Sequence, residues 1–300
     1  GVVRVTADDP RRALALVAAR FYPRQPETIV AVTGTSGKTS VAAFVRQIFA
    51  AAGHEAASIG TLGIVSRRWS TYGSLTTPDS ISLMASLDRL AGEGVTHAAL
   101  EASSHGLDQR RLAGVRVVAP GFPNLGRDHM ASPPTVGDYL AAKLRLFTAL
   151  LPAGDAAVID MDGAHSPDVA VVAARRGDRM IRIGRAGTEL KILDIAPSGF
   201  RQRVRVDAFG RVHDVLLPLA GAFQVSNALV AAGLAVGAGV DLDVALGALA
   251  RLEGAPGRLE LAGRRANGAM IFIDYAHKPE ALSAPPGACR PQPPARSGGP

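Results

Sequence analysis

The sequence has little cysteine, few lysines and no long apolar run, and each absence excludes a class of protein. Cys289 is the only cysteine in 300 residues, so no disulfide can form within the chain, and a reducing, cytoplasmic location is expected. No stretch of eighteen apolar residues occurs, and the opening GVVRVTADDPRRAL has no signal-peptide core, so we expect no membrane association. Apolar residues make up 47% and charged residues 20%, which is typical of a globular protein of one or two domains.

Lysine occurs only at positions 38, 143, 191 and 278, so 29 of the 33 basic residues are arginines. The net charge of +7 invites comparison with nucleic-acid-binding proteins. The arginines are scattered rather than massed on one segment, which favours a solvated surface, and we predict no nucleic-acid partner. Because lysine is rare in this chain, a lysine inside a motif favours a functional role over that of an ordinary solvent-exposed residue.

Residues 27–53 have the pattern of a strand, a glycine-containing loop and a helix. ETIVAVT (27–33) is a short β-branched run, and KTSVAAFVRQIFAAAG (38–53) places its apolar side chains on one helical face before a final glycine. Backbone N–H groups of such a loop and of the helix N-terminus point toward phosphate oxygens. This context predicts a phosphate-binding loop.

The loop residues fit that prediction with one departure. Gly34 and Gly37 would let the backbone approach a phosphate, Lys38 would reach the terminal phosphates, and Thr39 would ligate Mg²⁺. The usual pattern G-x-x-x-x-G-K-[ST] requires a glycine where Val32 stands, so the glycine spacing here is shorter. An ordinary strand-to-helix turn is the alternative, but Gly-Lys-Thr at a helix start behind an apolar strand favours phosphate binding.

Short apolar strands continue to alternate with helical patterns, which predicts a doubly wound, mostly parallel α/β sheet. From 189 to 219 the pattern changes to strands separated by turns, which predicts a small antiparallel edge sheet. The predicted strands are 96–103, 115–120, 156–162 and 179–184, and the predicted helices are 79–92, 135–150, 166–176, 222–238 and 241–251.

Chemically active side chains follow the predicted strands, where ligands bind in open α/β sheets. LEASSHGLDQRR ends a strand at Glu101, NLGRDH supplies Asp128 and His129, and Lys143 lies on the helix DYLAAKLRLF. Singly, Glu101 reads as a helix-starting acid, His129 as a loop residue and Lys143 as a snorkelling surface residue. Beside a phosphate loop, the carboxylate and the imidazole together predict ligands or orienters for Mg²⁺.

Eight segments appear in the order found in one family: TGTSGKTS, LTTPDS, EASSHGLDQRR, NLGRDH, YLAAKLRLF, LAGAFQVSNALVAAGLA, PGRLE and IDYAHKPEAL. Residues 28–282 resemble a Mur ligase, specifically its UDP-N-acetylmuramoyl-tripeptide synthetase branch. The related folylpolyglutamate synthetase group shares the loop and the central fold and is the alternative family. TTPDS followed by SSHGLDQRR resembles the muramyl-peptide enzymes much more.

The resemblance implies an ATP-dependent amide-bond ligase of peptidoglycan precursor synthesis. ATP would phosphorylate the terminal carboxylate of UDP-MurNAc-L-Ala-D-Glu, and the amine of a diamino acid, diaminopimelate or lysine, would attack the acyl phosphate. In phosphoryl transfer the protein mainly positions the reactants and stabilises the charge of the transferred group, and the loop and Mg²⁺ would do both. We expect a cytoplasmic monomer.

The resemblance also implies roles for single residues. Lys38, His129 and Lys143 would act in catalysis, and Thr39, Glu101, His129 and Lys143 would surround the metals. Thr76, Thr77, Ser103, Gln109 and Arg111 match positions that hold the UDP-muramyl substrate. The ATP site would comprise Gly34, Thr35, Ser36, Gly37, Lys38, Thr39, Ser40, Asn227, Arg258 and Asp274.

Lys143 matches the family's carbamylated lysine. A CO₂-derived carbamate converts a cation into an anionic oxygen ligand that suits Mg²⁺. Its formation requires a neutral amine, which burial and nearby cations favour.

The sequence departs from the family within one motif and at both ends. After His129 it reads MASPPTVGDY instead of an acid, an aromatic and a second histidine, and Pro123 stands where threonine is common. We expect a remnant of the uridine-binding domain and linker at 1–27, the central ATP-binding domain at 28–253, the start of the C-terminal domain at 254–282 and a disordered Pro/Gly-rich tail at 283–300. A truncation with a frame change near Ser283 is our hypothesis. A nucleotide- and UDP-sugar-binding remnant without turnover is therefore the alternative function.

Overall fold

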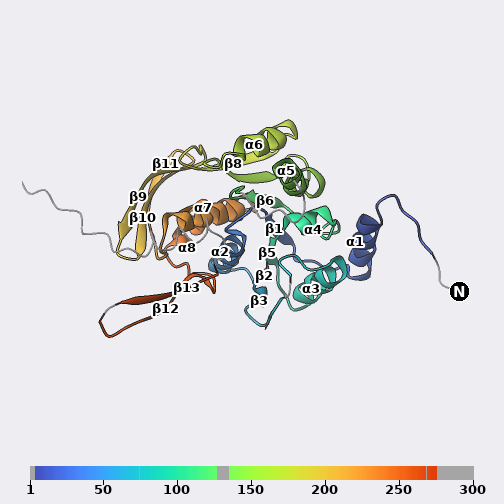
Figure 1. Ribbon diagram of the computed structural model, residues 1–300, viewed down its shortest axis with the longest axis horizontal. Helices are drawn as coiled ribbons and strands as arrows, with labels where there is room; N and C mark the ends of the chain where they lie inside the picture. Colours follow the sequence, from blue (N-terminus) through green and yellow to red (C-terminus); the bar gives the residue numbers. More distant parts are fainter. Residues whose placement is uncertain (1–3, 74, 127–134, 268, 276–300) are drawn as a thin grey trace, which may run out of the picture.

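Strands and helices alternate along most of the chain, because apolar runs of strand period alternate with segments of helical period. The computed structural model describes residues 4–73, 75–126, 135–267 and 269–275, and it shows one large sheet with helices on both faces (Figure 1). In spatial order the sheet comprises β11 (Arg211–Leu217), β10 (Arg201–Ala208), β9 (Leu190–Ser198), β8 (Arg179–Gly184), β7 (Ala156–Asp160), β6 (Ala119–Phe122), β1 (Thr28–Val32), β5 (His97–Glu101), β2 (Ala56–Gly60), β3 (Gly63–Ser66) and β4 (Ser70–Thr71).

The middle of this sheet is parallel and both of its edges are antiparallel. Successive pairings from β9 to β2 are parallel, whereas β9, β10 and β11 pair antiparallel at one edge and β2, β3 and β4 at the other. The predicted doubly wound, mostly parallel α/β fold with an antiparallel edge is confirmed. That edge continues the main sheet, because β9 still pairs parallel with β8.

Helices form two layers, one on each face of the sheet (Figure 1). Parallel strands require such crossover helices, and each layer buries its apolar stripe against the sheet. One layer contains α2 (Lys38–Ala51), α7 (Ala222–Gly237) and α8 (Leu242–Leu249). The other contains α1 (Pro10–Phe21), α3 (Ser80–Gly92), α4 (Ser104–Asp108), α5 (Val136–Arg145), the π-helix η1 (Leu146–Leu150) and α6 (Ser166–Arg175).

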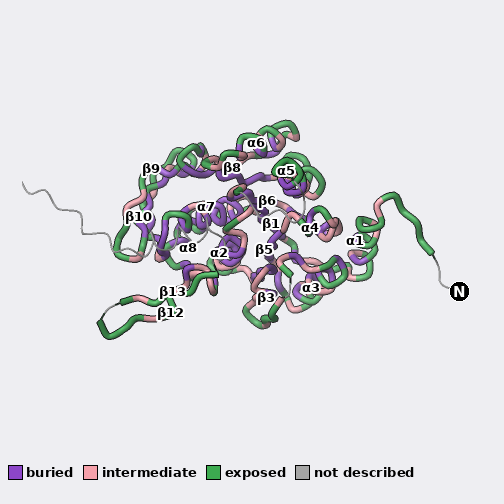
Figure 2. The backbone as a smooth tube through the Cα atoms, viewed as in Figure 1, coloured by how far each residue is buried: buried purple, intermediate pink, exposed green. Residues whose placement is uncertain are grey.

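Strand β1 shows how the sequence supplies both cores. Its side chains alternate in direction, so Val30 and Val32 join the core under α2 and α7, while Ile29 and Ala31 join the core on the opposite face. All four are buried, as are most central strands (Figure 2). A strand covered on both faces reads as a continuous apolar run, which is how it was recognised in the sequence.

Two predicted elements differ from the structure. The strand expected at 115–120 lies at Ala119–Phe122, because its register with β1 begins at Ala119. Val115 and Val117 pack into the core before it, and the Val118 N–H donates to the Ile29 carbonyl at 2.9 Å. The helix expected at 135–150 is α-helical only to Arg145 and continues as the π-helix η1. The first two residues of this wider turn, Leu146 and Phe147, are completely buried.

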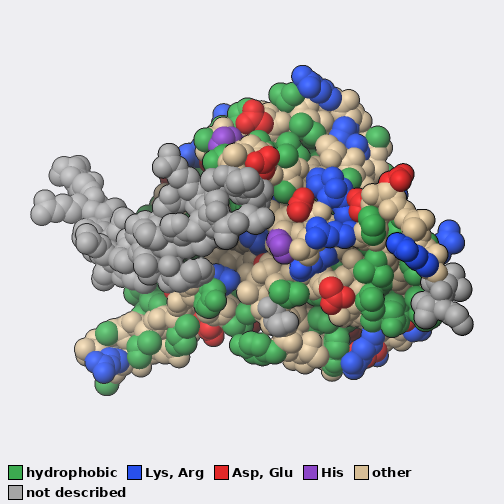
Figure 3. All heavy atoms as spheres, turned by 45° about the vertical axis from the view of Figure 1, so that its right-hand side comes forward, with side chains coloured by type: hydrophobic (Ala, Val, Ile, Leu, Met, Phe, Trp, Pro, Cys, Tyr) green, Lys and Arg blue, Asp and Glu red, His purple; other side chains and the backbone are tan. Residues whose placement is uncertain are grey.

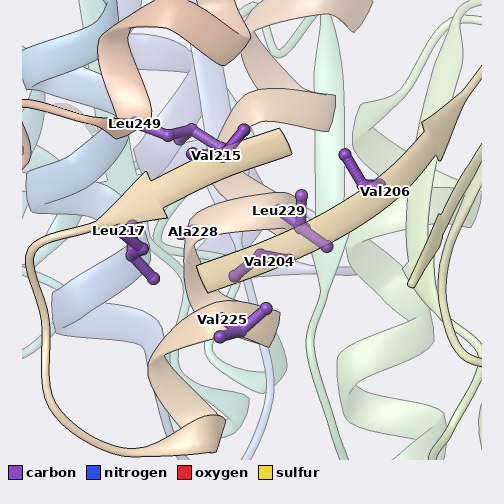
Figure 4. Close-up of a pocket in the computed structure, with 8 residues that line it drawn as sticks. All are labelled: Val204, Val206, Val215, Leu217, Val225, Ala228, Leu229 and Leu249. Carbon is purple, nitrogen blue, oxygen red and sulfur yellow. The ribbon is translucent and has the colours of Figure 1, made fainter. Parts of the chain in front are cut away.

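The antiparallel end of the sheet encloses a small apolar void with α7 and α8 (Figure 4). Its volume is about 10 Å³, close to the least that a single water molecule needs, and its lining offers no polar side chain. This void belongs to the packing of the core and is not a ligand site. Its lining residues are Val204, Val206, Val215, Leu217, Val225, Ala228, Leu229 and Leu249.

A second, two-stranded antiparallel sheet follows α8. It pairs β12 (Arg258–Arg264) with β13 (Met270–Asp274) and projects from the main body at the lower left of Figure 1. Within the described ranges, no helix is long and apolar enough to cross a lipid bilayer.

Candidate functional site

The predicted phosphate loop connects the carboxyl end of β1 to the first turn of α2. Gly37 has a φ of 87°, a left-handed conformation that favours glycine. A Cβ atom at this position would lie 2.2 Å from Oδ1 of Asn227 on α7. Glycine is therefore required here both by the backbone and by the close approach of a residue 190 positions further along the chain.

Lys38 lies against the loop that precedes it. Its ammonium donates hydrogen bonds to the carbonyl oxygens of Gly34, at 2.8 Å, and Thr35, at 3.1 Å. Asn124, which follows β6, fixes the same loop from the other side: its side chain accepts from the Ser36 N–H at 3.0 Å and donates to the Ser36 carbonyl at 3.1 Å. This role of Asn124 was not predicted, although the NLGRDH motif contains the residue.

Glu101 ends β5, the strand beside β1, and only 3% of it is exposed. Its carboxylate accepts from the Thr39 hydroxyl at 3.1 Å, from the Thr61 N–H at 2.8 Å and from the Thr61 hydroxyl at 3.2 Å. Burial raises the pKa of this carboxyl, and the positive charge of Lys38 and these hydrogen bonds oppose the rise. Gly60 makes room for it, because a Cβ there would lie 2.1 Å from the carboxylate.

Thr61 was not predicted. The available signal was its position directly after a strand that ends in glycine, since β2 neighbours β5 and strand ends gather ligands.

Thr39 and Glu101 fit a magnesium ion by their chemistry. Both offer hard oxygen donors, and Mg²⁺ is usually held by one or two carboxylates together with water and substrate phosphates. Across the described residues, no group of three or more histidine, cysteine, aspartate or glutamate side chains could hold a metal by itself. The predicted third ligand, His129, and its neighbour Asp128 lie outside the described residues.

Lys143 is buried, with 1% of the residue exposed, so the interpretation as a snorkelling surface lysine is wrong. Its amine donates to the Gly34 carbonyl at 2.8 Å, the same oxygen that Lys38 contacts, and lies 4.1 Å from the centroid of the Tyr139 ring. Burial and the nearby charge of Lys38 lower the pKa of Lys143 to about 6. The lowered pKa favours the neutral, nucleophilic form of the amine.

The five residues expected to hold the muramyl substrate converge beside Glu101. Thr77 donates to the Glu101 carbonyl at 2.8 Å and accepts from the Ser103 N–H at 2.9 Å. Arg111 donates to the Thr77 carbonyl at 2.6 Å and to the Gln109 side chain at 2.7 Å. Thr76 joins through the Thr61 hydroxyl, 3.1 Å away. One hydrogen-bonded network thus connects this segment to the carboxylate at the loop.

The residues expected at the nucleotide are brought together only in part. Asn227 lies under Gly37 and donates at 2.9 Å to Gln224, whose own amide donates at 3.2 Å to the Arg258 carbonyl. The Arg258 guanidinium reaches the Thr39 hydroxyl at 3.5 Å. Gln224, which is 1% exposed, was not predicted, and its position three residues before Asn227 on one helical face was the available signal.

Two further predicted residues lie beside this arrangement. Asp274 pairs in register with Arg258 in the two-stranded sheet and accepts from the Leu259 N–H at 2.7 Å. Ser40 is buried in the first turn of α2.

Known proteins share both the sequence and the fold. The family model described as the Mur ligase middle domain matches residues 32–235. A protein of Bradyrhizobium diazoefficiens named UDP-N-acetylmuramoyl-L-alanyl-D-glutamate–2,6-diaminopimelate ligase is 57% identical over 291 residues, which cover 96% of this chain and 60% of that protein. The protein of the same name from Brucella melitensis is 55% identical over 282 residues, which cover 94% and 58%.

Solved structures agree with these relatives. A structure of a protein named UDP-N-acetylmuramoyl-L-alanyl-D-glutamate–2,6-diaminopimelate ligase aligns with a TM-score of 0.82 at 30% identity, covering 94% of this chain and 58% of that one. The apo form of L. casei FPGS aligns with a TM-score of 0.75 at 18% identity, covering 96% and 77%, and this likeness shows the fold alone. The chain spans about 60% of the length of the curated relatives it matches.

Proposed function

The chain belongs to the Mur ligase family, and from that premise we propose that it forms the ATP-dependent part of a ligase that adds diaminopimelate to UDP-MurNAc-L-Ala-D-Glu. The observation that carries this proposal is the convergence of Lys38, Thr39, Glu101 and Lys143 on one loop, in a chain 57% identical to a ligase of that name. The relatives' name favours diaminopimelate over lysine. The product would be a peptidoglycan precursor.

The first chemical step is assigned to the loop. A terminal carboxylate oxygen of the muramyl dipeptide would attack the γ-phosphorus of ATP, and the bond to the β-phosphate oxygen would break, leaving ADP and an acyl phosphate. Lys38 and the loop N–H groups would neutralise the transferred phosphoryl group. Thr39 and Glu101 would hold Mg²⁺, with His129 as a proposed further ligand, and the ion would supply additional positive charge to the phosphates.

The second step requires the substrate carboxyl to stay in place after phosphorylation. The amine of diaminopimelate would attack the acyl carbon, and inorganic phosphate would leave. We assign the hold on the muramyl dipeptide to Thr76, Thr77, Ser103, Gln109 and Arg111, which already form one network beside Glu101. A network with fixed partners loses little conformational entropy when a ligand binds.

Lys143 is proposed to carry a carbamate. Its neutral amine would attack CO₂ and release one proton, which converts the side chain into an anionic oxygen ligand for magnesium. Burial at 1% exposure and a pKa of about 6 support this chemistry. A ¹³C carbamate resonance in the protein equilibrated with labelled bicarbonate, absent from Lys143→Met, is the expected result; equal spectra would contradict the assignment.

Asn227, Arg258 and Asp274, together with residues Gly34 to Ser40, would surround the ATP. The domain division at 1–27, 28–253, 254–282 and 283–300, the cytoplasmic location and the monomeric state are likewise proposed, and the tail lies outside the described residues.

Mg-ATP binding tests the central assignment. Calorimetric titration of Lys38→Ala should show affinity at least tenfold weaker, because a charge-assisted contact contributes about 1.5–3 kcal/mol. Lys191→Ala, which removes an exposed lysine on β9, is the matched control and should bind normally. Equal affinity of Lys38→Ala and the control would reject the phosphate-loop assignment.

Phosphate release separates the ligase from a binding remnant. The chain is incubated with ATP, Mg²⁺, UDP-MurNAc-L-Ala-D-Glu and diaminopimelate, and each component is omitted in turn. Release that requires both acceptor substrates supports ligation by this chain. Tight Mg-ATP binding without substrate-dependent release supports the remnant.

A further inference from the structure

A second polar cavity lies outside the phosphate loop, where α1, the turn after α4 and the end of α5 meet. Three arginines line it together with apolar side chains from α4 and η1. Its volume is about 50 Å³, several times what one water molecule occupies on this measure. The lining residues are Arg12, Leu107, Arg110, Leu112, Ala113, Arg145, Ala149 and Leu150, and none belongs to the site described above.

Arg145 lines this cavity and is partly exposed, and its guanidinium, which carries five N–H donors, makes no hydrogen bond among the described residues. Burial and the positive charge of Arg110 lower the pKa of Arg145, and the Asp108 and Asp9 carboxylates oppose this shift. Arg12 on α1 is exposed, and its side chain likewise makes no hydrogen bond among the described residues. Two of the three guanidinium groups thus keep their donors available.

Arg110 reaches the cavity from a strained backbone. Its φ of 61° is left-handed, a conformation that non-glycine residues adopt rarely and that persists where the surroundings hold it. Its Nε donates to the Asp9 carboxylate at 2.9 Å, and its guanidinium lies 3.9 Å from the Asp108 carboxylate. These two acids face three guanidinium groups, so one positive charge remains in excess.

With the side of α1, α4 and α5 turned forward, Figure 3 shows Lys and Arg side chains gathered near the middle of the face, with acidic side chains beside them. A bound dianion would accept the available donors and reduce the repulsion between Arg110 and Arg145.

We propose that Arg12, Arg110 and Arg145 form a binding site for a phosphate-type dianion, separate from the phosphate loop. The planar guanidinium fork matches phosphate oxygens bidentately, and such charge-assisted contacts are stronger than hydrogen bonds between neutral groups. The same chemistry has two sources, free inorganic phosphate and the diphosphate of a nucleotide, and the cavity volume accommodates a single phosphate group. The inference does not rest on the proposed ligase activity.

Arginine side-chain NMR tests the site directly. Inorganic phosphate is titrated into ¹⁵N-arginine-labelled protein at constant ionic strength with chloride, and the Nε–H resonances of Arg110 and Arg145 are followed after assignment from the variants. Saturable shifts of both resonances are expected. Phosphate bound only at the Lys38 loop would leave them unmoved and would overturn the proposal.

Variants make the test specific. Arg145→Gln should weaken the saturable shift of Arg110 about tenfold, and Arg110→Gly, which suits the left-handed backbone, should weaken that of Arg145 similarly. Arg203→Gln, which removes an exposed arginine on β10, should bind like the wild type. Equal titrations in all variants, each folded by circular dichroism, would reject the site.

A parallel titration with uridine diphosphate identifies the source. Tighter saturation than with phosphate assigns the site to a nucleotide, and weaker saturation assigns it to free phosphate. Linear shifts with both ligands, as chloride exchange at a surface would produce, would reject the proposal.

Discussion

The free energy of unfolding should fall as the pH is lowered from 7 to 5, and the titration of His97 should account for a measurable share of that fall. His97 begins β5 and is 8% exposed. Its ring stacks on His54 at 3.7 Å between centroids and meets the edge of Phe49 at 4.8 Å. Burial and the neighbouring His54 lower the pKa of His97 from 6.5 to about 4.

The sign and size follow from proton linkage. Between pH 6.5 and about 4 the unfolded chain binds a proton at His97 that the folded chain does not, so stability is lost as the pH falls through this window. Over the range from pH 7 to 5 the linkage gives about 2 kcal/mol. Solvent near the partly exposed His54 screens the pair, so we expect about 1 kcal/mol, or about 2–4 °C in Tm.

Urea unfolding at pH 7, 6 and 5 measures this effect. His97→Gln removes the titrating ring while it keeps a polar partner for the Thr96 hydroxyl, which lies 2.9 Å from His97 Nδ1. The variant should lose about 1 kcal/mol less than the wild type between pH 7 and 5. His165→Gln, which removes a partly exposed histidine, should behave like the wild type. Parallel pH profiles for the wild type and His97→Gln would refute the reasoning.

Two further predictions concern the loop. Gly37→Ala should abolish Mg-ATP binding in calorimetry and lower the Tm, because its Cβ would lie 2.2 Å from the Asn227 side-chain oxygen. Near-normal binding would show that α7 can shift to make room for the Cβ, and would contradict this prediction. In buffer freed of CO₂ and bicarbonate, which keeps Lys143 a free amine, wild-type stability in urea should rise by about 2 kcal/mol from pH 7 to 9, because unfolded lysine keeps its proton while the Lys143 amine, with a pKa of about 6, has lost it. Lys143→Met should lack that rise, and a retained rise would exclude Lys143 as its source.

The sequence by itself determined the class of fold and the position of the loop. The apolar run 27–33, the helical period after Lys38 and the glycines between them are local signals, and each depends on neighbours a few residues away. The alternation of such units predicts a parallel sheet, since parallel strands require crossover helices. Where the local signal was mixed, as around β6 and at the end of α5, the expected boundaries were wrong.

Tertiary structure alone decided which side chains meet. Helical spacing placed Lys143 beside apolar residues, but only the packing of α5 against the loop puts its amine on the Gly34 carbonyl and lowers its pKa. Asn227 reaches Gly37, and Thr61 reaches Glu101, across sequence separations that no local period encodes. The three arginines of the second cavity likewise come from segments far apart in the sequence, namely α1, the turn after α4 and the end of α5. Period and propensity act within a segment, whereas burial, hydrogen-bond partners and shifted pKa values arise only when separate segments exclude water together.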